Sequence, residues 1–316
     1  GWGKNVESLD DQVPHFGVTP REIVRMLVKV CKLLNLPHQF HLHTNNLGKP
    51  GNYRTVIETI EAVSDLAEGK KPVLHITHVQ FCGYKGDSWI KLKSGAEEIA
   101  KLVNNRSYVT IDTGCVWFGD TTTMTADGPF QFILYRLTGN KWVNSDVELE
   151  TGAGIVPIRY RRRSFVNALQ WSIGLELALL VKDPWRVYVT TDHPNGAPFI
   201  RYPDVIACLM SKEAREKELK KVNRRARRRS LLPSIEREYT LYEVAIVTRA
   251  GPAKILGLKS KGHLGVGADA DVAVYDLDPE KIDLSRDYEV VKKAFSKAYY
   301  TVKGGEVVVK EGEVVR

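Results

Sequence analysis

Potential metal ligands follow three apolar, strand-like runs at widely separated places in this chain. The three segments are 41–46 (HLHTNN), 75–80 (HITHVQ) and 190–196 (TTDHPNG). In a (β/α)₈ barrel the chemistry lies where the strands end, and the side chains that carry it come from strands far apart in the sequence. The three segments therefore predict a metal site at one end of a barrel-like sheet.

Helical and strand-like patterns alternate along the first part of the chain. Thr19 and Pro20 begin a helix in the preferred way, with a capping side chain followed by a proline at the first helical position. The expected helices cover residues 20–34, 55–66, 96–102 and 165–181, and the expected strands end near residues 43, 78, 112 and 191. Helices that alternate with short buried strands indicate a parallel sheet with crossover helices.

Two regions depart from this alternation. Residues 114–160 are rich in Gly, Thr and Asp, and we expect this long insertion to be neither helical nor strand-like, as in lids or partner-binding loops at the top of a barrel. After Gly257 the pattern changes to glycine-rich, alternating strands. We therefore predict a barrel part over residues 1–257 and a small appended β unit over residues 258–316.

The candidate ligands support a metal site more strongly together than singly. His41 and His43 lie two apart on a strand, so both point to one face and one or both could reach a metal ion; a hydrogen-bonded pair is the alternative. Asp192 ends a buried strand, where an inward carboxylate needs a cation, a hydrogen-bond network or a proton. With His78, the order His, His, Asp favours a divalent metal. Imidazole and carboxylate ligands suit catalytic zinc.

Composition excludes several other classes of protein. The chain is 43% hydrophobic and 27% charged, and no stretch approaches the roughly 18 apolar residues of a membrane span. With no signal-peptide pattern at the start, we predict a cytoplasmic protein without membrane contact. The four cysteines form no Cys-x-x-Cys pair, which argues against a thiolate zinc site and a disulfide scaffold.

The formal charge of +8 comes largely from one basic run at residues 220–229. The run lacks the interleaved aromatic residues and glycine-rich strands of an RNA-binding surface, so we predict no nucleic-acid partner. A solvated helix face and a docking patch for an acidic partner subunit both remain open for it.

The order of a strand His, a later strand His and a final strand Asp resembles strands five, six and eight of the amidohydrolase superfamily. Within it the chain closely resembles the family of formylmethanofuran dehydrogenase A subunits. Residues 248–275 also resemble the segment that leaves the barrel and forms the superfamily's small β-sandwich. The motifs that carry the resemblance are 41–48 (HLHTNNLG), 77–81 (THVQF), 118–129 (FGDTTTMTADGP), 139–144 (GNKWVN) and 190–196 (TTDHPNG).

The resemblance implies an α/β fold: the C-terminal part of a metal-dependent amidohydrolase (β/α)₈ TIM-like barrel, with a small β-sandwich domain. It also implies a catalytic subunit that splits or condenses the formyl amide of N-formylmethanofuran at a binuclear zinc site. Other subunits of the complex would be its partners, and one of them would hold a molybdenum or tungsten pterin.

The resemblance assigns roles residue by residue. His43 and His78 would be zinc ligands, and Asp192 would be both a ligand and the proton carrier. His43 is preferred to His41 because it aligns with the superfamily's fifth-strand histidine, although His41 stays open as a further contact. The residues that directly follow the ligands are expected to orient the substrate, with loop caps as the alternative for each. They are Asn45, Asn46, Gln80, His193 and Asn195.

Part of the family's metal site is missing from this sequence. No His-x-His pair precedes residue 41, and the lysine of the family's fourth strand has no counterpart. The sequence resembles a family member that begins just after its fourth strand, so we expect this chain alone to be inactive. Either it is part of a longer subunit, which Gly1 in place of methionine favours, or a separate chain supplies the first half.

Two other functions remain open. A cyclic-amide amidohydrolase of the dihydroorotase or hydantoinase kind would share the strand-end ligands, but it gives no reason for the motifs within 121–129 and 140–144. A catalytically inactive scaffold subunit would keep the shape and lose the site. The retention of His43, His78 and Asp192 speaks against the scaffold.

Overall fold

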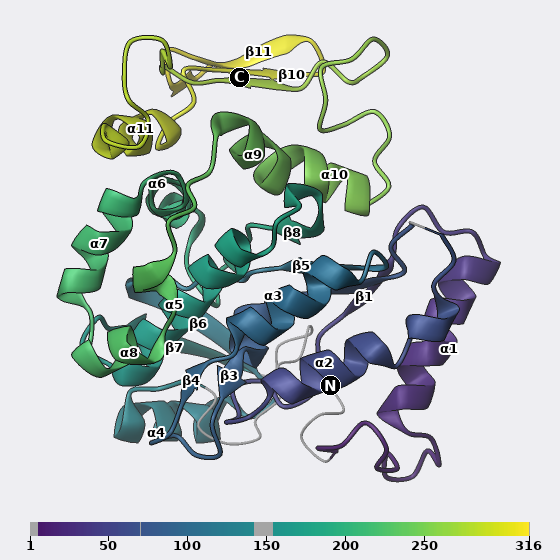
Figure 1. The fold of residues 1–316 in the computed structure, drawn as a ribbon. Coiled ribbons are helices and arrows are strands. Elements are labelled where there is room, and N and C mark those ends of the chain that lie inside the picture. The colour runs from purple at the N-terminus through teal and green to yellow at the C-terminus, as the bar shows by residue number, and fades with distance from the viewer. Residues whose placement is uncertain (1–5, 70, 142–153, 316) are drawn as a thin grey trace.

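A parallel sheet with crossover helices forms the centre of the computed structural model, which describes residues 6–69, 71–141 and 154–315 (Figure 1). The sheet has four strands in the order β1-β2-β5-β8, and each strand pairs in parallel with its neighbours. The strands are β1 (Phe40–Leu42), β2 (Leu74–Ile76), β5 (Val109–Asp112) and β8 (Val187–Tyr188). This connectivity is that of part of a (β/α)₈ barrel and confirms the predicted fold class.

The predicted helices flank this sheet. The first begins with a capping box, in which Thr19 and Glu22 exchange side-chain and backbone hydrogen bonds. The last is the core helix, because residues 166–179 are all buried. The four helices are α1 (Pro20–Leu33), α2 (Tyr53–Glu61), α3 (Ala96–Asn105) and α5 (Phe165–Leu180). None of the helices in the described part of the chain is long and apolar enough to cross a membrane.

The expectation that residues 114–160 are neither helical nor strand-like was wrong for the described part of this range; residues 142–153, with the end of the 139–144 motif, lie outside the described residues. Strands β6 (Gly119–Thr125) and β7 (Gly154–Tyr160) pair along their whole length as an antiparallel ribbon, and α4 (Gly128–Thr138) packs against it. Alternate β7 residues are buried, which is the period of a half-buried strand. The composition was misleading because the threonines lie in β6, where β-branched residues are favoured, while Asp127 caps α4.

A second sheet lies at the C-terminal end of the chain, at the top of Figure 1. It is antiparallel, in the order β12-β11-β10-β9. Helix α11 (Tyr288–Phe295) packs against α6 (Tyr202–Met210) of the barrel part. The division between the two parts at residue 257 remains our proposal. The elements of this region are α9 (Leu241–Ala245), α10 (Gly251–Ile255), β9 (Val272–Val274), α11 (Tyr288–Phe295), β10 (Tyr300–Lys303), β11 (Glu306–Lys310) and β12 (Glu313–Val314).

The basic run at 220–229 covers the end of α7 and all of α8. Ala226 is buried against α5, and the Arg225 guanidinium lies 4.7 Å above the Phe165 ring. Arg224 stays exposed with other arginines of the run, so α8 presents a basic face to solvent. That face is compatible with both roles expected for the run. The three helices here are α6 (Tyr202–Met210), α7 (Lys212–Lys221) and α8 (Arg224–Arg229).

In the described part of the chain, β1 and β8 form the two edges of the parallel sheet. Beside β1, helix α1 and its C-cap residue expose large apolar side chains, with Met26 59%, Leu33 85% and Leu34 61% exposed. An unpaired strand edge next to such an apolar face is a surface that proteins normally cover. We therefore expect further polypeptide to cover this side of the sheet.

A buried carboxyl group joins the core helix to the short ribbon of β3 (Tyr84–Lys85) and β4 (Lys93–Ser94). Glu176 accepts hydrogen bonds from the backbone N–H groups of Leu231, at 2.7 Å, and Leu232, at 3.0 Å, and from the Ser94 hydroxyl. Burial raises the pKa of Glu176 above its ordinary value of 4.5. Glu176 therefore binds a proton more readily in the folded chain than in the unfolded one.

This difference predicts a pH-dependent effect of Glu176→Gln. Between pH 4.5 and the raised pKa the folded state holds more protons, so the free energy of unfolding of the wild type falls as pH rises. Glutamine can accept both N–H bonds and donate to Ser94 without this titration. We expect urea unfolding at a series of pH values to show a relative gain for the variant that grows with pH and then levels off. A constant difference at all pH values would contradict the assignment.

Candidate metal centre

His43 and His78 lie together at the carboxyl ends of β1 and β2. The strands pair in register, with His41 opposite His75, so the residues that follow them leave the sheet side by side. His78 then turns out of the strand with a φ of +36°, and its Nε2 comes to 2.7 Å from Nδ1 of His43. The structure thus brings two of the predicted ligands into direct contact.

The environment of His43 favours a neutral imidazole. Burial, reinforced by the neighbouring rings of His78 and His41, lowers the pKa of His43 to about 3. A neutral ring has a free lone pair, which is the form that binds a cation. Tetrahedral zinc with bonds of about 2.0–2.1 Å needs its nitrogen ligands about 3.3 Å apart. The two nitrogen atoms are 2.7 Å apart, so the rings need to separate by only about 0.6 Å to admit a zinc ion between them. The geometry of the pair is therefore compatible with zinc.

A buried network lies directly behind this pair. The Nε2 atom of His75 lies 3.0 Å from Oδ2 of Asp112, and its Nδ1 lies 2.9 Å from the Thr110 hydroxyl. Burial raises the pKa of Asp112, but hydrogen bonds from His75 and from Thr190 outweigh it and hold that pKa well below its usual range. Asp112 is therefore a carboxylate. Both ring nitrogens of His75 are engaged within this network, so His75 is not a candidate ligand.

Asp112 is not among the residues predicted from the sequence, although the sequence contains a signal for it. Asp112 ends the apolar strand β5, which is the same position that made Asp192 a candidate. An inward carboxylate at a buried strand end needs a partner in either case. The criterion, applied evenly, would have selected both residues.

Gly114 allows close packing beneath His78. Its φ is +65°, and a Cβ atom built on it would lie 2.5 Å from the Cβ of His78. Real Cβ atoms do not approach so closely, so residue 114 has no room for a side chain. The turn after β5 therefore requires glycine for two independent reasons.

Asp192 lies in a tight loop that follows β8. It is half-buried with a φ of +47°, and Gly196 closes the loop through a 3.0 Å hydrogen bond from its N–H to the carbonyl of Thr191. Within the described residues, no three His, Cys, Asp or Glu side chains come close enough to hold a metal ion. The pair of His43 and His78 is thus the assembled part of the predicted set, and Asp192 as a ligand remains a prediction.

Comparison with known proteins identifies the family. The model of the amidohydrolase family matches residues 1–309. The chain belongs to the amidohydrolase family. It is 52% identical, over its whole length, to protein FwdA of Methanocaldococcus jannaschii, of which it covers 56%. It is 40% identical, over 98% of its length, to the A subunit of the formyltransferase/hydrolase complex Fhc of Methylorubrum extorquens, of which it covers 54%.

A solved structure shows the same likeness in three dimensions. The crystal structure of the formyltransferase/hydrolase complex FhcABCD from Methylorubrum extorquens, in complex with methylofuran, contains a chain that matches with a TM-score of 0.82 at 41% identity. The match covers 98% of our chain and 54% of the other. The resemblance to these A subunits is confirmed, and the chain spans about half the length of the relatives it matches.

The residues expected to orient substrate in this amidohydrolase have other contacts. The Asn45 and Asn46 amides donate to the carbonyls of Val6, at 3.3 Å, and Glu7, at 2.7 Å, so both tie down the segment before α1. The Gln80 side chain is buried, and its oxygen accepts a hydrogen bond from the N–H of Val116 at 3.0 Å. It therefore links the turn after β2 to the turn after β5.

The loop that carries His193 and Asn195 meets the ribbon of β6 and β7. His193 is exposed and stacks on Phe199 with 3.8 Å between ring centres. The Asn195 oxygen accepts from the backbone N–H of Met124 at 3.3 Å, and the Thr121 hydroxyl donates to the carbonyl of Pro194. The threonine-rich motif thus contacts the loop that carries Asp192. These contacts do not involve a substrate, and a role of His193 or Asn195 in orienting the substrate remains a prediction.

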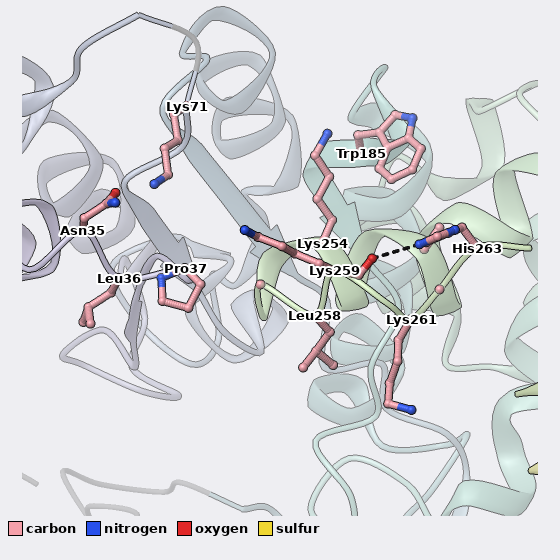
Figure 2. A pocket seen from close by; sticks show the side chains of 13 residues that line it. Asn35, Leu36, Pro37, Lys71, Trp185, Lys254, Leu258, Lys259, Lys261 and His263 are labelled. Atoms are coloured by element: carbon pink, nitrogen blue, oxygen red, sulfur yellow. Dashed lines mark hydrogen bonds between the residues drawn. The ribbon is translucent and has the colours of Figure 1, made fainter. Parts of the chain in front are cut away.

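A cavity of about 520 Å³ lies at the other end of the strands (Figure 2). Its walls include Pro37, which precedes β1, and Trp185, which precedes β8, with Lys254 and Lys259 between them. Amidohydrolases, like other (β/α)₈ enzymes, place their chemistry at the carboxyl ends of the strands. The cavity is therefore not the candidate centre, which lies at His43 and His78.

Proposed function

We propose that this chain is part of the catalytic A subunit of a formylmethanofuran dehydrogenase or formyltransferase/hydrolase complex. The reaction would be hydrolysis and condensation of an N-formyl amide, between N-formylmethanofuran and formate plus methanofuran. The observation that carries the proposal is the contact of His43 and His78 at the carboxyl ends of β1 and β2, in a chain 52% identical to FwdA.

The metal site would be binuclear zinc and would be shared with protein outside these 316 residues. His43 and His78 would hold one face of it, and Asp192 would complete this chain's share. The open sheet edge at β1 and the apolar face of α1 support this proposal, since they offer a surface for the polypeptide that would bring the other ligands. That polypeptide would belong to the same subunit or to a separate chain.

When bound, zinc lowers the pKa of a water molecule and polarises a carbonyl group. This chain's own residues would position the site and move the proton. His43 and His78 would present neutral imidazoles, and Asp192 would take the proton of the attacking water and pass it to the leaving amine. Condensation is the same path in reverse. A partner subunit would hold the molybdenum or tungsten pterin, and the complex would be cytoplasmic.

Elemental analysis together with activity tests the proposal. The complete protein that contains this chain should hold close to two zinc ions per polypeptide and hydrolyse an N-formyl amine. His78→Ala should lose zinc and activity together, whereas His263→Ala, an exposed histidine of the C-terminal region, should keep both. Zinc with activity only on cyclic amides would favour a dihydroorotase-like enzyme. Absence of zinc and of both activities would mean a scaffold.

A further inference from the structure

Asp112 connects the strand ends that carry two of the predicted ligands. It ends β5, which lies between β2 and β8 in the sheet. Its Oδ1 atom accepts one hydrogen bond from the backbone N–H of His78, at 2.9 Å, and another from the hydroxyl of Thr190. Thr190 precedes Asp192 by two residues. One buried oxygen atom on the middle strand therefore holds the chain at both neighbouring strand ends.

The other oxygen of the carboxylate fixes its orientation. Oδ2 lies 3.0 Å from Nε2 of His75, and the opposite ring nitrogen is held at 2.9 Å by Thr110. Asp112 is only 4% exposed, so solvent does not compete for these bonds. The carboxylate is thus clamped on one side and directs its other oxygen toward His78 and Thr190.

Thr190 closes the connection on the far side. Its hydroxyl donates to Asp112 and accepts from the N–H of Gly114 at 2.9 Å, and Gly114 is the residue that packs directly on His78. The contacts therefore form a closed cycle that runs from His78 to Asp112, Thr190 and Gly114 and back to His78. A shift of any one of these residues would strain its contacts with its two neighbours in this set.

This cycle of contacts includes or adjoins two residues with unfavourable backbone conformations. His78 has a φ of +36° and Asp192 a φ of +47°, both in the left-handed region that non-glycine residues rarely adopt. Such residues persist only when their surroundings fix them, and they cluster at functional sites. The bond from the His78 N–H to Asp112, and the anchoring of Thr190 just before Asp192, supply that support.

We propose that Asp112 is a positioning residue for the metal centre: through the His78 backbone and the Thr190 hydroxyl it sets where the His78 ring and the Asp192 carboxylate lie relative to each other. It acts through these residues and touches neither metal nor substrate. The inference rests on the proposed function, since it requires His78 and Asp192 to serve one centre. Mutation of residues that hold metal ligands in place typically lowers metal affinity or activity about 10- to 100-fold.

Thr190→Val tests this role in the complete protein that contains this chain, because valine has nearly the same shape without the hydroxyl. We expect Zn²⁺ affinity, measured by competition with a chelator, to fall about 10- to 100-fold, and kcat to fall while KM changes little. The visible absorption of the Co²⁺-substituted protein should change as well. Thr190→Ser restores the hydroxyl and should return the affinity and the Co²⁺ spectrum to the wild-type values.

Thr59→Val provides a matched control. Thr59 is a buried threonine of α2 whose hydroxyl donates to the carbonyl of Thr55 at 2.6 Å, so the same atoms are changed away from the centre. It should lower Tm and leave Zn²⁺ affinity unaltered. Asp112→Asn serves as a second probe if Thr190→Val does not fold, because asparagine keeps one oxygen for His78 and Thr190 but loses the acceptor for His75. It should also weaken Zn²⁺ binding and alter the Co²⁺ spectrum.

The outcomes separate the two proposals. The wild type could contain zinc while Thr190→Val and Asp112→Asn bind Zn²⁺ with the same affinity as the wild type. This result would overturn the positioning role and leave the proposed function intact. A wild type without zinc would overturn both. Loss of affinity in Thr190→Val with recovery in Thr190→Ser would support the role, because a purely structural contribution would lower Tm without a change in the Co²⁺ spectrum.

Discussion

Asp192→Asn should lower the rate of N-formyl amide hydrolysis by the complete protein about 10²- to 10⁴-fold, the usual contribution of a positioned general acid or base. Asparagine keeps the size of the side chain but cannot carry a proton. Its loop should keep its shape, because the bond from Gly196 to Thr191 uses only backbone atoms. Measured at saturating substrate, the loss should appear in kcat.

Two further measurements interpret this result. Zinc content should be determined on the same preparation, since loss of a ligand and loss of a proton carrier both reduce kcat. Asp278→Asn is the matched control, because this aspartate lies in the C-terminal part and pairs with Lys281 in an exposed ion pair. Activity of Asp192→Asn within a few-fold of Asp278→Asn would remove Asp192 from the mechanism.

Gly114→Ala should destabilise the protein by about 2–5 kcal/mol, the sum of a strained backbone conformation and an overpacked contact. The φ of +65° disfavours any L side chain, and the new Cβ would lie 2.5 Å from the Cβ of His78. Because His78 must move to relieve this overlap, zinc content should fall too. Urea unfolding and elemental analysis would measure the two effects.

Gly17→Ala separates strain from overlap. Gly17 has the same φ of +65°, but nothing lies within 4 Å of the position of its Cβ. This control should therefore cost only about 1–2 kcal/mol and leave zinc unchanged. If Gly114→Ala costs no more than Gly17→Ala, the contact with His78 is not a tight one and the account of the turn after β5 is wrong.

The sequence predicted the framework of the site because strand ends are visible in it. Apolar runs that end in polar residues identified β1, β2 and β8, and parallel strands in register bring the residues that follow them together. The contact of His43 with His78 follows from that register. Thr19 likewise predicted the start of α1 correctly, because a capping box depends only on residues three apart.

Other features depend on tertiary structure and could not be predicted from local pattern. His78 has a left-handed conformation and donates its N–H to Asp112, a residue 34 positions away in the sequence. The contacts of Asn45 and Asn46 depend on where the segment before α1 lies. In the insertion, threonine-rich composition indicated a loop, although pairing with β7 makes those residues a strand.

In the described part of the chain, the unpaired edge of the parallel sheet at β1 also determines how the protein should be handled. A strand edge beside an apolar helix face makes the folded state depend on whatever covers it, so its apparent stability follows mass action. If a separate chain supplies that polypeptide, Tm should rise with its concentration, and dilution should favour dissociation and aggregation. Fusing that polypeptide to the chain would replace a bimolecular equilibrium by an intramolecular one and remove the concentration dependence.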